Sequence, residues 1–134
     1  MSKSFLRGLR ESFREGVYAR DDHKCRVCGM KEGTNGAHLD AHHITDRHQL
    51  PNDGYTLSNG ITLCPEHHKK AEVWHSTHQH CWVPGFTPDE LYSMIGSSAA
   101  KAYADSWALD PRSAYAAHFT APPLTLPIPP PPPN

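Results

Sequence analysis

The sequence predicts one small α+β domain with extensions at both ends. Three observations support this fold class: apolar residues at helical spacing near the start, short β-compatible runs before a second helical pattern, and a helix-capping signal near residue 87. With 134 residues and 37% hydrophobic content, the chain can build one modest core but not two sizeable ones. We therefore expect something besides apolar packing to stabilise it.

Residues 4–19 form the first predicted helix. Its apolar positions recur at helical spacing: Leu6, Leu9, Phe13 and Val17. Basic residues recur along one face of the same helix: Lys3, Arg7, Arg10 and Arg14. This basic face has two possible interpretations. It is either a solvated surface on which Glu11 and Glu15 are partners of the basic residues, or a surface that contacts phosphate groups.

Short apolar runs separated by turn residues follow between residues 22 and 63. The runs KCRVCG, HLDAHHI and NGITLC predict a hairpin with a long irregular connection. Pro65 then opens a predicted helix, PEHHKKAEVWH, at a position where its missing N–H costs no hydrogen bond. The expected order is strand, strand, helix.

A capping box begins the last predicted helix, with Thr87 as N-cap and Glu90 three residues later. This helix is expected to run from Pro88 towards Ala108, with a weak point at Gly96-Ser97-Ser98. The proline-rich end, APPLTLPIPPPPPN, predicts polyproline II or disorder, with a PxxP ligand as the alternative. The expected organisation is an N-terminal helix (1–20), a core (21–80), a helical extension (81–118) and a tail (119–134).

Two short pairs of metal-binding residues stand on either side of the predicted hairpin. Cys25 and Cys28 form a CxxC pair, and Cys64 and His67 form a CxxH pair. Such pairs can converge on one tetrahedral zinc ion with no open position, which is typical of a structural site. The ion would close a long loop that a modest core holds poorly.

Charge and hydropathy exclude several classes of protein. A formal net charge of -1 argues against a protein that coats nucleic acid by bulk electrostatics. The sequence has no apolar run near 18 residues and no secretory signal pattern, so we expect no membrane contact. The cysteine pattern indicates metal ligands and not disulfides, which is typical of a protein in a reducing compartment. We therefore expect a cytoplasmic location.

The stretches AHHI and SNGITLCPEHH resemble the HNH endonuclease motif in its zinc-bearing form. The resemblance covers roughly residues 20–75, with the pieces in order and at compatible gaps. It implies a ββα-metal (His-Me finger) core flanked by the N-terminal helix and one or two C-terminal helices. It also implies a metal-dependent endonuclease that hydrolyses phosphodiester bonds in DNA, which we expect to be double-stranded.

The resemblance assigns a role to each matching residue. His43 would be the general base, free of metal and with a pKa near neutrality. His42 and His68 would bind the catalytic divalent ion. Asn59 would fix the loop that carries the base, or take a more direct part in the site. His67 stands where a second cysteine is more common, which gives a Cys3His structural zinc site.

The adjacent histidines make physical sense on a strand, where neighbouring side chains point to opposite faces and can perform two different tasks. Two imidazole ligands suggest tolerance of Mn²⁺, Ni²⁺, Co²⁺ or Zn²⁺ beside Mg²⁺. Four residues could contact phosphates, each with ordinary solvent exposure as the alternative: Arg47, His48, Lys69 and Lys70.

Irregular spacing favours a polar loop over a second zinc site for the remaining group, His75, His78, His80 and Cys81. Trp74 and Trp82 are expected in the core or as lid aromatics. The sequence also admits a zinc-stabilised binding or interaction module that acts as part of a larger complex, with the proline-rich tail as a contact for a protein partner. Competent residues at every matching position favour catalysis over this alternative.

Overall fold

A computed structural model describes residues 3–109. The proline-rich tail and the end of the predicted helical extension lie outside the described residues. Within them the protein is α+β, as predicted, with a two-stranded antiparallel sheet and four α-helices. The helices and strands are α1 (Lys3–Arg20), β1 (Asp40–His43), β2 (Gly60–Leu63), α2 (Pro65–Ser76), α3 (Pro88–Met94) and α4 (Ala99–Ala108). Four short 3-10 turns lie at Thr34–Gly36, Arg47–Gln49, Pro51–Gly54 and Leu57–Asn59.

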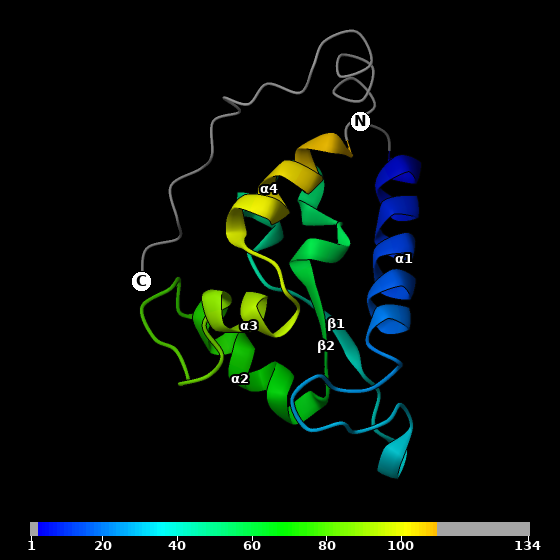
Figure 1. Ribbon diagram of the computed structural model, residues 1–134, viewed down its shortest axis with the longest axis vertical. Coiled ribbons are helices and arrows are strands. Elements are labelled where there is room, and N and C mark those ends of the chain that lie inside the picture. Colours follow the sequence, from blue (N-terminus) through cyan, green and yellow to red (C-terminus); the bar gives the residue numbers. More distant parts are fainter. Residues whose placement is uncertain (1–2, 110–134) are drawn as a thin grey trace, which may run out of the picture.

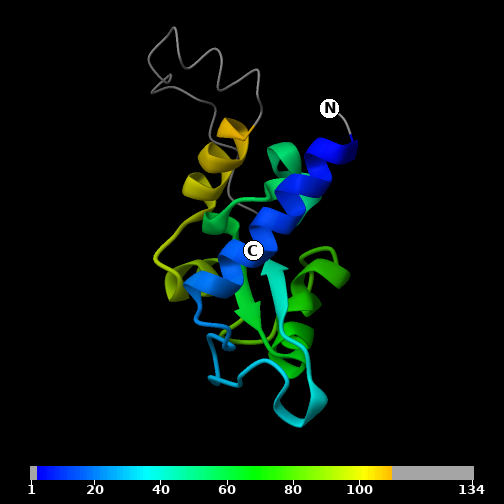
Figure 2. The same cartoon turned by 90° about the vertical axis from the view of Figure 1, so that its right-hand side faces the viewer.

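The hairpin lies between two layers of helix (Figures 1 and 2). Helix α1 packs along one face of the strands, and α2 follows β2 and covers the other face. In the hairpin, His42 pairs with Ile61 and His43 with Gly60. Both β1 and β2 are only four residues long, so the helices provide most of the packing surface.

Helix α1 approaches β2 closely because Gly60 has no side chain. A Cβ atom at Gly60 would lie 2.5 Å from the side chain of Val17 and 2.6 Å from the ring of Phe13. Phe13 and Val17 are buried there with Tyr55, and they form a small apolar cluster under α1. This contact confirms the apolar face predicted for the first helix.

A larger core lies on the α2 side of the hairpin. Its buried residues come from β2, α2, α3 and α4 and include Ile61, Leu63, Leu91, Tyr92 and Ala102. Helices α3 and α4 therefore complete the hydrophobic core rather than standing apart from it.

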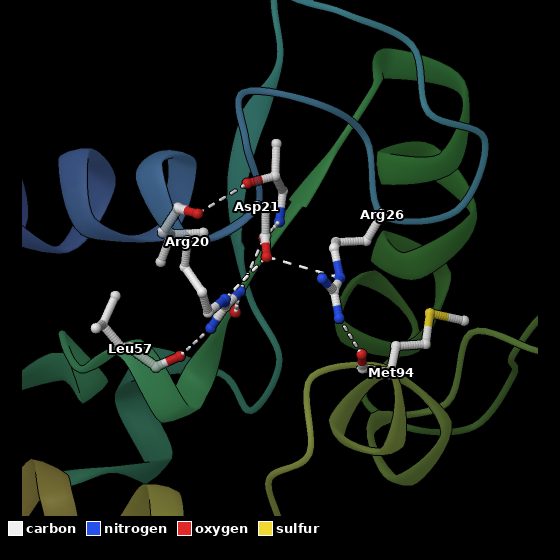
Figure 3. A network of polar contacts seen from close by, with 8 residues as sticks. Arg20, Asp21, Arg26, Leu57 and Met94 are labelled. Carbon is white, nitrogen blue, oxygen red and sulfur yellow. Dashed lines mark hydrogen bonds and ion pairs between the residues drawn. The ribbon is translucent and has the colours of Figure 1, made fainter.

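Asp21 connects α1, the following loop and β2 (Figure 3). Its side chain is fully buried and accepts hydrogen bonds at 2.8 Å from Nε and Nη2 of Arg20 and at 2.9 Å from the amide of Thr62. Arg20 also donates to the carbonyl of Gly60 at 2.6 Å. Arg26 lies 3.6 Å from the Asp21 carboxylate and donates to the carbonyl of Met94 in α3. The network ties the end of α1 to the hairpin and to the C-terminal helices.

Two details of the predicted elements are wrong. KCRVCG forms no strand among the described residues, because Cys25 to Gly29 curl into a tight turn in which the Gly29 amide bonds the Cys25 carbonyl at 2.8 Å. Only an isolated bridge joins Lys24 to Lys31. The predicted helix from Pro88 to Ala108 is divided into α3 and α4 at the expected weak point, where Gly96 has φ 67°. The capping box of Thr87 and Glu90 is confirmed.

We predict that Asp21→Ala lowers the free energy of unfolding by about 3–5 kcal/mol, because it leaves two arginines without their buried partner. Burial opposes the charged carboxylate, but hydrogen bonds from Arg20 and Thr62 outweigh it and hold the pKa of Asp21 below 3.8. The contribution is therefore present above the pKa of the unfolded chain and is lost as pH falls through the lower folded pKa. Urea denaturation at neutral pH and at about pH 2 to 3 measures both effects. Glu11→Ala, which removes an exposed carboxylate from α1, is the matched control; equal losses in the two variants would contradict the assignment.

Candidate metal centres and catalytic groove

Strand β1 sends its two adjacent histidines to opposite faces. His42 is buried and faces α2, where its Nδ1 lies 3.3 Å from Glu72 Oε1. His43 faces α1, where its ring stacks on Phe13 with centroids 4.6 Å apart. The alternation expected from the sequence is thus present, with one helix over each imidazole.

The four residues predicted for a structural zinc site lie together. Cys25, Cys28, Cys64 and His67 each offer a donor atom within 4.8 Å of the others. Cys28 Sγ lies 3.8 Å from Cys64 Sγ, and His67 Nδ1 lies 3.7 Å from Cys25 Sγ and 3.2 Å from Cys64 Sγ. Donors around a tetrahedral zinc ion lie about 3.5–3.8 Å apart, so this set could bind zinc.

Local structure favours the thiolate form of Cys25. Burial raises the pKa of this thiol, but amide hydrogen bonds from Cys28, Cys64 and Val27 outweigh burial and lower the pKa to about 7. The pKa of Cys28 is raised, chiefly by burial and by the neighbouring sulfur atoms. Three sulfur atoms crowded together repel one another as thiolates, and a cation among them would remove that repulsion.

We predict that Cys28→Ser abolishes stoichiometric zinc binding and lowers the free energy of unfolding by about 3 kcal/mol or more, because the ion and the fold share these ligands. Metal analysis of the purified protein and thermal unfolding measure the two effects. Cys81→Ser is the matched control, since Cys81 is an exposed cysteine outside the cluster. An unchanged melting temperature for Cys28→Ser would contradict a structural role.

A second group of metal-binding side chains lies between β1 and α2. His42, Glu72 and His75 offer donor atoms that all lie within 4.8 Å of one another. His68, which the family resemblance pairs with His42, borders this group: its Nε2 lies 3.4 Å from Glu72 Oε1, and its ring centroid lies 5.1 Å from that of His42. One face of α2 carries the three residues at positions i, i+4 and i+7, which are His68, Glu72 and His75.

One ring nitrogen of His68 and one ring nitrogen of His75 form hydrogen bonds with neighbouring groups. His68 Nδ1 lies 3.0 Å from the Asp40 carboxylate, and His75 Nε2 donates to the carbonyl of His43 at 3.0 Å. Since a neutral imidazole has one N–H, these bonds leave His68 Nε2 and His75 Nδ1 with lone pairs. Histidines that bind metals are commonly oriented in this way.

Electrostatics also suit a cation at this place. Burial lowers the pKa of His42 to about 4, so its imidazole is neutral near pH 7. The pKa of Glu72 is strongly lowered by its contacts with His42 and His68. A hydrogen bond with Glu72 raises the pKa of His68, because a carboxylate at each nitrogen stabilises the protonated ring; a divalent ion bound at Nε2 would replace that proton. Buried His42 Nε2 has no hydrogen-bond partner among the described residues. The donor set therefore fits a divalent ion.

His43 lines a cavity of about 300 Å³ together with His42, His68, Glu72 and His75. His43 also lines a further cavity, of about 470 Å³, on the α1 side, where its ring stacks on Phe13. Burial lowers the pKa of His43 to about 4, with the neighbouring His42 and Arg47 as smaller causes. The expectation of a pKa near neutrality is therefore wrong for the protein without substrate. The imidazole is neutral at pH 7 and can accept a proton.

Asn59 fixes the backbone on which His43 stands. Its side chain is buried and bonds the Thr45 backbone twice, accepting from the amide at 2.9 Å and donating to the carbonyl at 3.1 Å. It also donates to the Gly54 carbonyl and accepts from the hydroxyl of Tyr92 at 2.8 Å. These four bonds use the hydrogen-bonding capacity of the whole amide and tie the loop after β1 to the start of β2.

The structure separates the four residues considered for phosphate contact. Arg47 and His48 line the cavity beside His43. Lys69 and Lys70 do not line this cavity, and the ammonium of Lys70 lies 5.8 Å from the ring of Phe86.

Sequence reasoning missed two residues of the second group. From the sequence, Glu72 has no assigned role, and His75, the last residue of the predicted helix, belongs to a polar group without metal; in the structure both offer donor atoms to the metal-binding cluster. The signal that could have found them is the i, i+4, i+7 spacing from His68. Trp74 is buried, as expected, and Trp82 packs edge-on against it while 48% exposed.

We predict that Glu72→Gln weakens binding of Mn²⁺ or Ni²⁺ to the zinc-loaded protein by at least about tenfold, because it removes the only carboxylate in the cluster. Isothermal titration calorimetry measures this affinity. His75→Ala and His68→Ala, tested in parallel, show which imidazole shares the ion with His42. Glu66→Gln, at an exposed position of the same helix, is the control. Wild-type affinity in Glu72→Gln would remove Glu72 from the site.

A hairpin followed by a helix, with metal-binding side chains between strand and helix, defines a ββα-metal domain. Residues 25–73 match the family model described as HNH endonuclease, and the resemblance stated from the sequence is confirmed over this segment. Comparisons with curated proteins and with solved structures gave no significant match. Among the described residues, no helix is both long and apolar enough to cross a lipid bilayer.

Proposed function

We propose that the protein is a metal-dependent endonuclease that hydrolyses phosphodiester bonds in double-stranded DNA. The observation that carries the proposal is one cavity of about 300 Å³ that His43 lines together with the metal-binding group of His42, Glu72 and His75. Of these residues, His42, His43 and Glu72 lie within the segment that matches the HNH family, residues 25–73, and His75 lies two residues beyond it.

His43 is the general base in this proposal. Its ring is held between Phe13 and Tyr55, with centroid distances of 4.6 and 5.1 Å, so its direction is fixed before substrate binds. A neutral imidazole can take a proton from water as the water attacks phosphorus. A phosphate anion beside the ring would raise the low pKa of His43 and make it a stronger base.

His42 and Glu72 hold the catalytic divalent ion in this proposal, with His68, His75 or both as further ligands. The ion, Mg²⁺, Mn²⁺ or another divalent metal, supplies stabilisation of the negative charge that grows on the phosphate and leaving oxygens. Asp40 orients His68 through the hydrogen bond to its Nδ1. The Cys3His set binds a structural Zn²⁺, which holds the start of α2 in place.

Arg47 and His48 are the proposed phosphate contacts of the cavity. Arg47 is exposed beside His43, and its Nη1 lies 3.4 Å from the hydroxyl of Tyr55. Its guanidinium can donate two parallel hydrogen bonds to a phosphate. The proposed cytoplasmic location rests on the four cysteines, which form no disulfide in the described part of the chain and suit a reducing compartment.

We predict that the wild-type protein cleaves plasmid DNA with Mg²⁺, Mn²⁺ or Ni²⁺, and that His43→Ala lowers the rate by at least about 100-fold, because the water loses its base. Agarose gels of supercoiled, nicked and linear plasmid measure cleavage. His38→Ala is the control, because His38 is 86% exposed and lies on a surface loop.

Zinc content and melting temperature should be unchanged in His43→Ala, so that loss of activity is not loss of fold. Cutting retained by a folded His43→Ala protein would remove His43 from the mechanism. DNA binding without cleavage under all three metals would favour the alternative, a zinc-stabilised nucleic-acid-binding module of a larger complex.

A further inference from the structure

The cavity that holds His43 is continuous with a second cavity under α1. The second cavity measures about 470 Å³ and shares Ala41, His43, Arg47 and His68 with the first. Because the same side chains line both, the two cavities form one groove that passes over His43. We call the second cavity, which lies under α1, the α1 arm of the groove.

Arg10 and Arg14 form the outer wall of the α1 arm. They lie one helical turn apart on α1, with Phe13 between them turned inward against the His43 ring. Both arginines are exposed. Phe13 therefore ties the part of α1 that bears the two arginines to the ring of His43.

The two arginines have no competing partner nearby. In the part of the chain that the structure describes, neither forms an ion pair, and Glu11 and Glu15 do not line the groove. The solvated pairing with Glu11 and Glu15 that the sequence left open is therefore not formed. Asp40, the one acid in the α1 arm, is 3.0 Å from His68. Arg10, Arg14 and Arg47 thus give the α1 arm a positive field beside the base.

We propose that Arg10 and Arg14 bind backbone phosphates of the DNA next to the scissile bond and so position the duplex over His43. Side chains at i and i+4 have Cβ atoms about 5–6 Å apart, which lets the two guanidiniums contact separate phosphates of one strand. The local positive wall also explains how a chain of net charge -1 can hold a polyanion. The inference rests on the proposed nuclease function, but it concerns binding and can be tested apart from cleavage.

The test is the salt dependence of duplex binding. A fluorescein-labelled DNA duplex is titrated with zinc-loaded protein, without added catalytic metal, over about 50 to 200 mM KCl, and anisotropy gives the association constant. Each lost phosphate contact reduces the slope of log K against log salt by about 0.9, so Arg10→Gln/Arg14→Gln should reduce the slope by about 1.8. In plasmid cleavage the same variant should raise KM and leave kcat unchanged, because the chemistry at His43 is intact.

Lys31→Gln/Lys101→Gln is the matched control, since it removes two exposed positive charges outside the groove. The control should keep the wild-type slope, and melting temperatures should be unchanged in both double variants. A wild-type slope in Arg10→Gln/Arg14→Gln would overturn the inference while cleavage by the wild type still supports the nuclease. The same loss in the control would overturn it too, as an effect of overall charge.

The remaining outcomes separate the inference from the nuclease function. Wild-type binding without cleavage would refute the nuclease, and a reduced slope in Arg10→Gln/Arg14→Gln would still support the phosphate contacts. Absence of any duplex binding by the wild type would overturn both.

Discussion

The site depends on one strand being covered on both faces. Successive side chains of β1 point in opposite directions, so a strand packed on one face only would leave one histidine of the pair in solvent. Here α2 covers His42 and α1 covers His43. The two imidazoles thereby acquire different surroundings, one among metal-binding groups and the other between aromatic rings. A shift of one residue in the register between β1 and β2 would exchange these surroundings.

Several buried contacts hold that register. Gly60 stands opposite His43 and lets α1 lie directly on the hairpin. Asn59 then joins the end of β1 to the start of β2, through its side chain to Thr45 and through its carbonyl to the amide of Ile44 at 2.9 Å. Asp21 holds the next part of β2 through the amide of Thr62. The positions of both histidines are thus fixed by Gly60, Asn59 and Asp21, none of which lines the groove.

Local signals in the sequence predicted much of this arrangement. Apolar spacing predicted a helix over residues 4–19, close to the observed α1 (Lys3–Arg20), and the two ligand pairs predicted the cluster of Cys25 with His67. Metal-binding by Glu72 could not be inferred in the same way, because a glutamate on a polar helix face is ordinary until the strand opposite is known. The pKa of His43 depends on burial by α1, and no residue near it in sequence carries that information.

The first helix lies outside the segment that matches the HNH family, residues 25–73, yet it supplies one side of the groove. His42, His43 and Glu72 lie in the matched segment and His75 lies two residues beyond it, whereas the ring that stacks on His43 comes from Phe13 of α1. In the proposed nuclease, the residues of the reaction and the arginines proposed to bind DNA phosphates therefore come from different parts of the chain. A fragment limited to residues 25–73 would lack α1 and would expose Tyr55 and Ala41 to solvent, because both pack against the cluster that Phe13 and Val17 form.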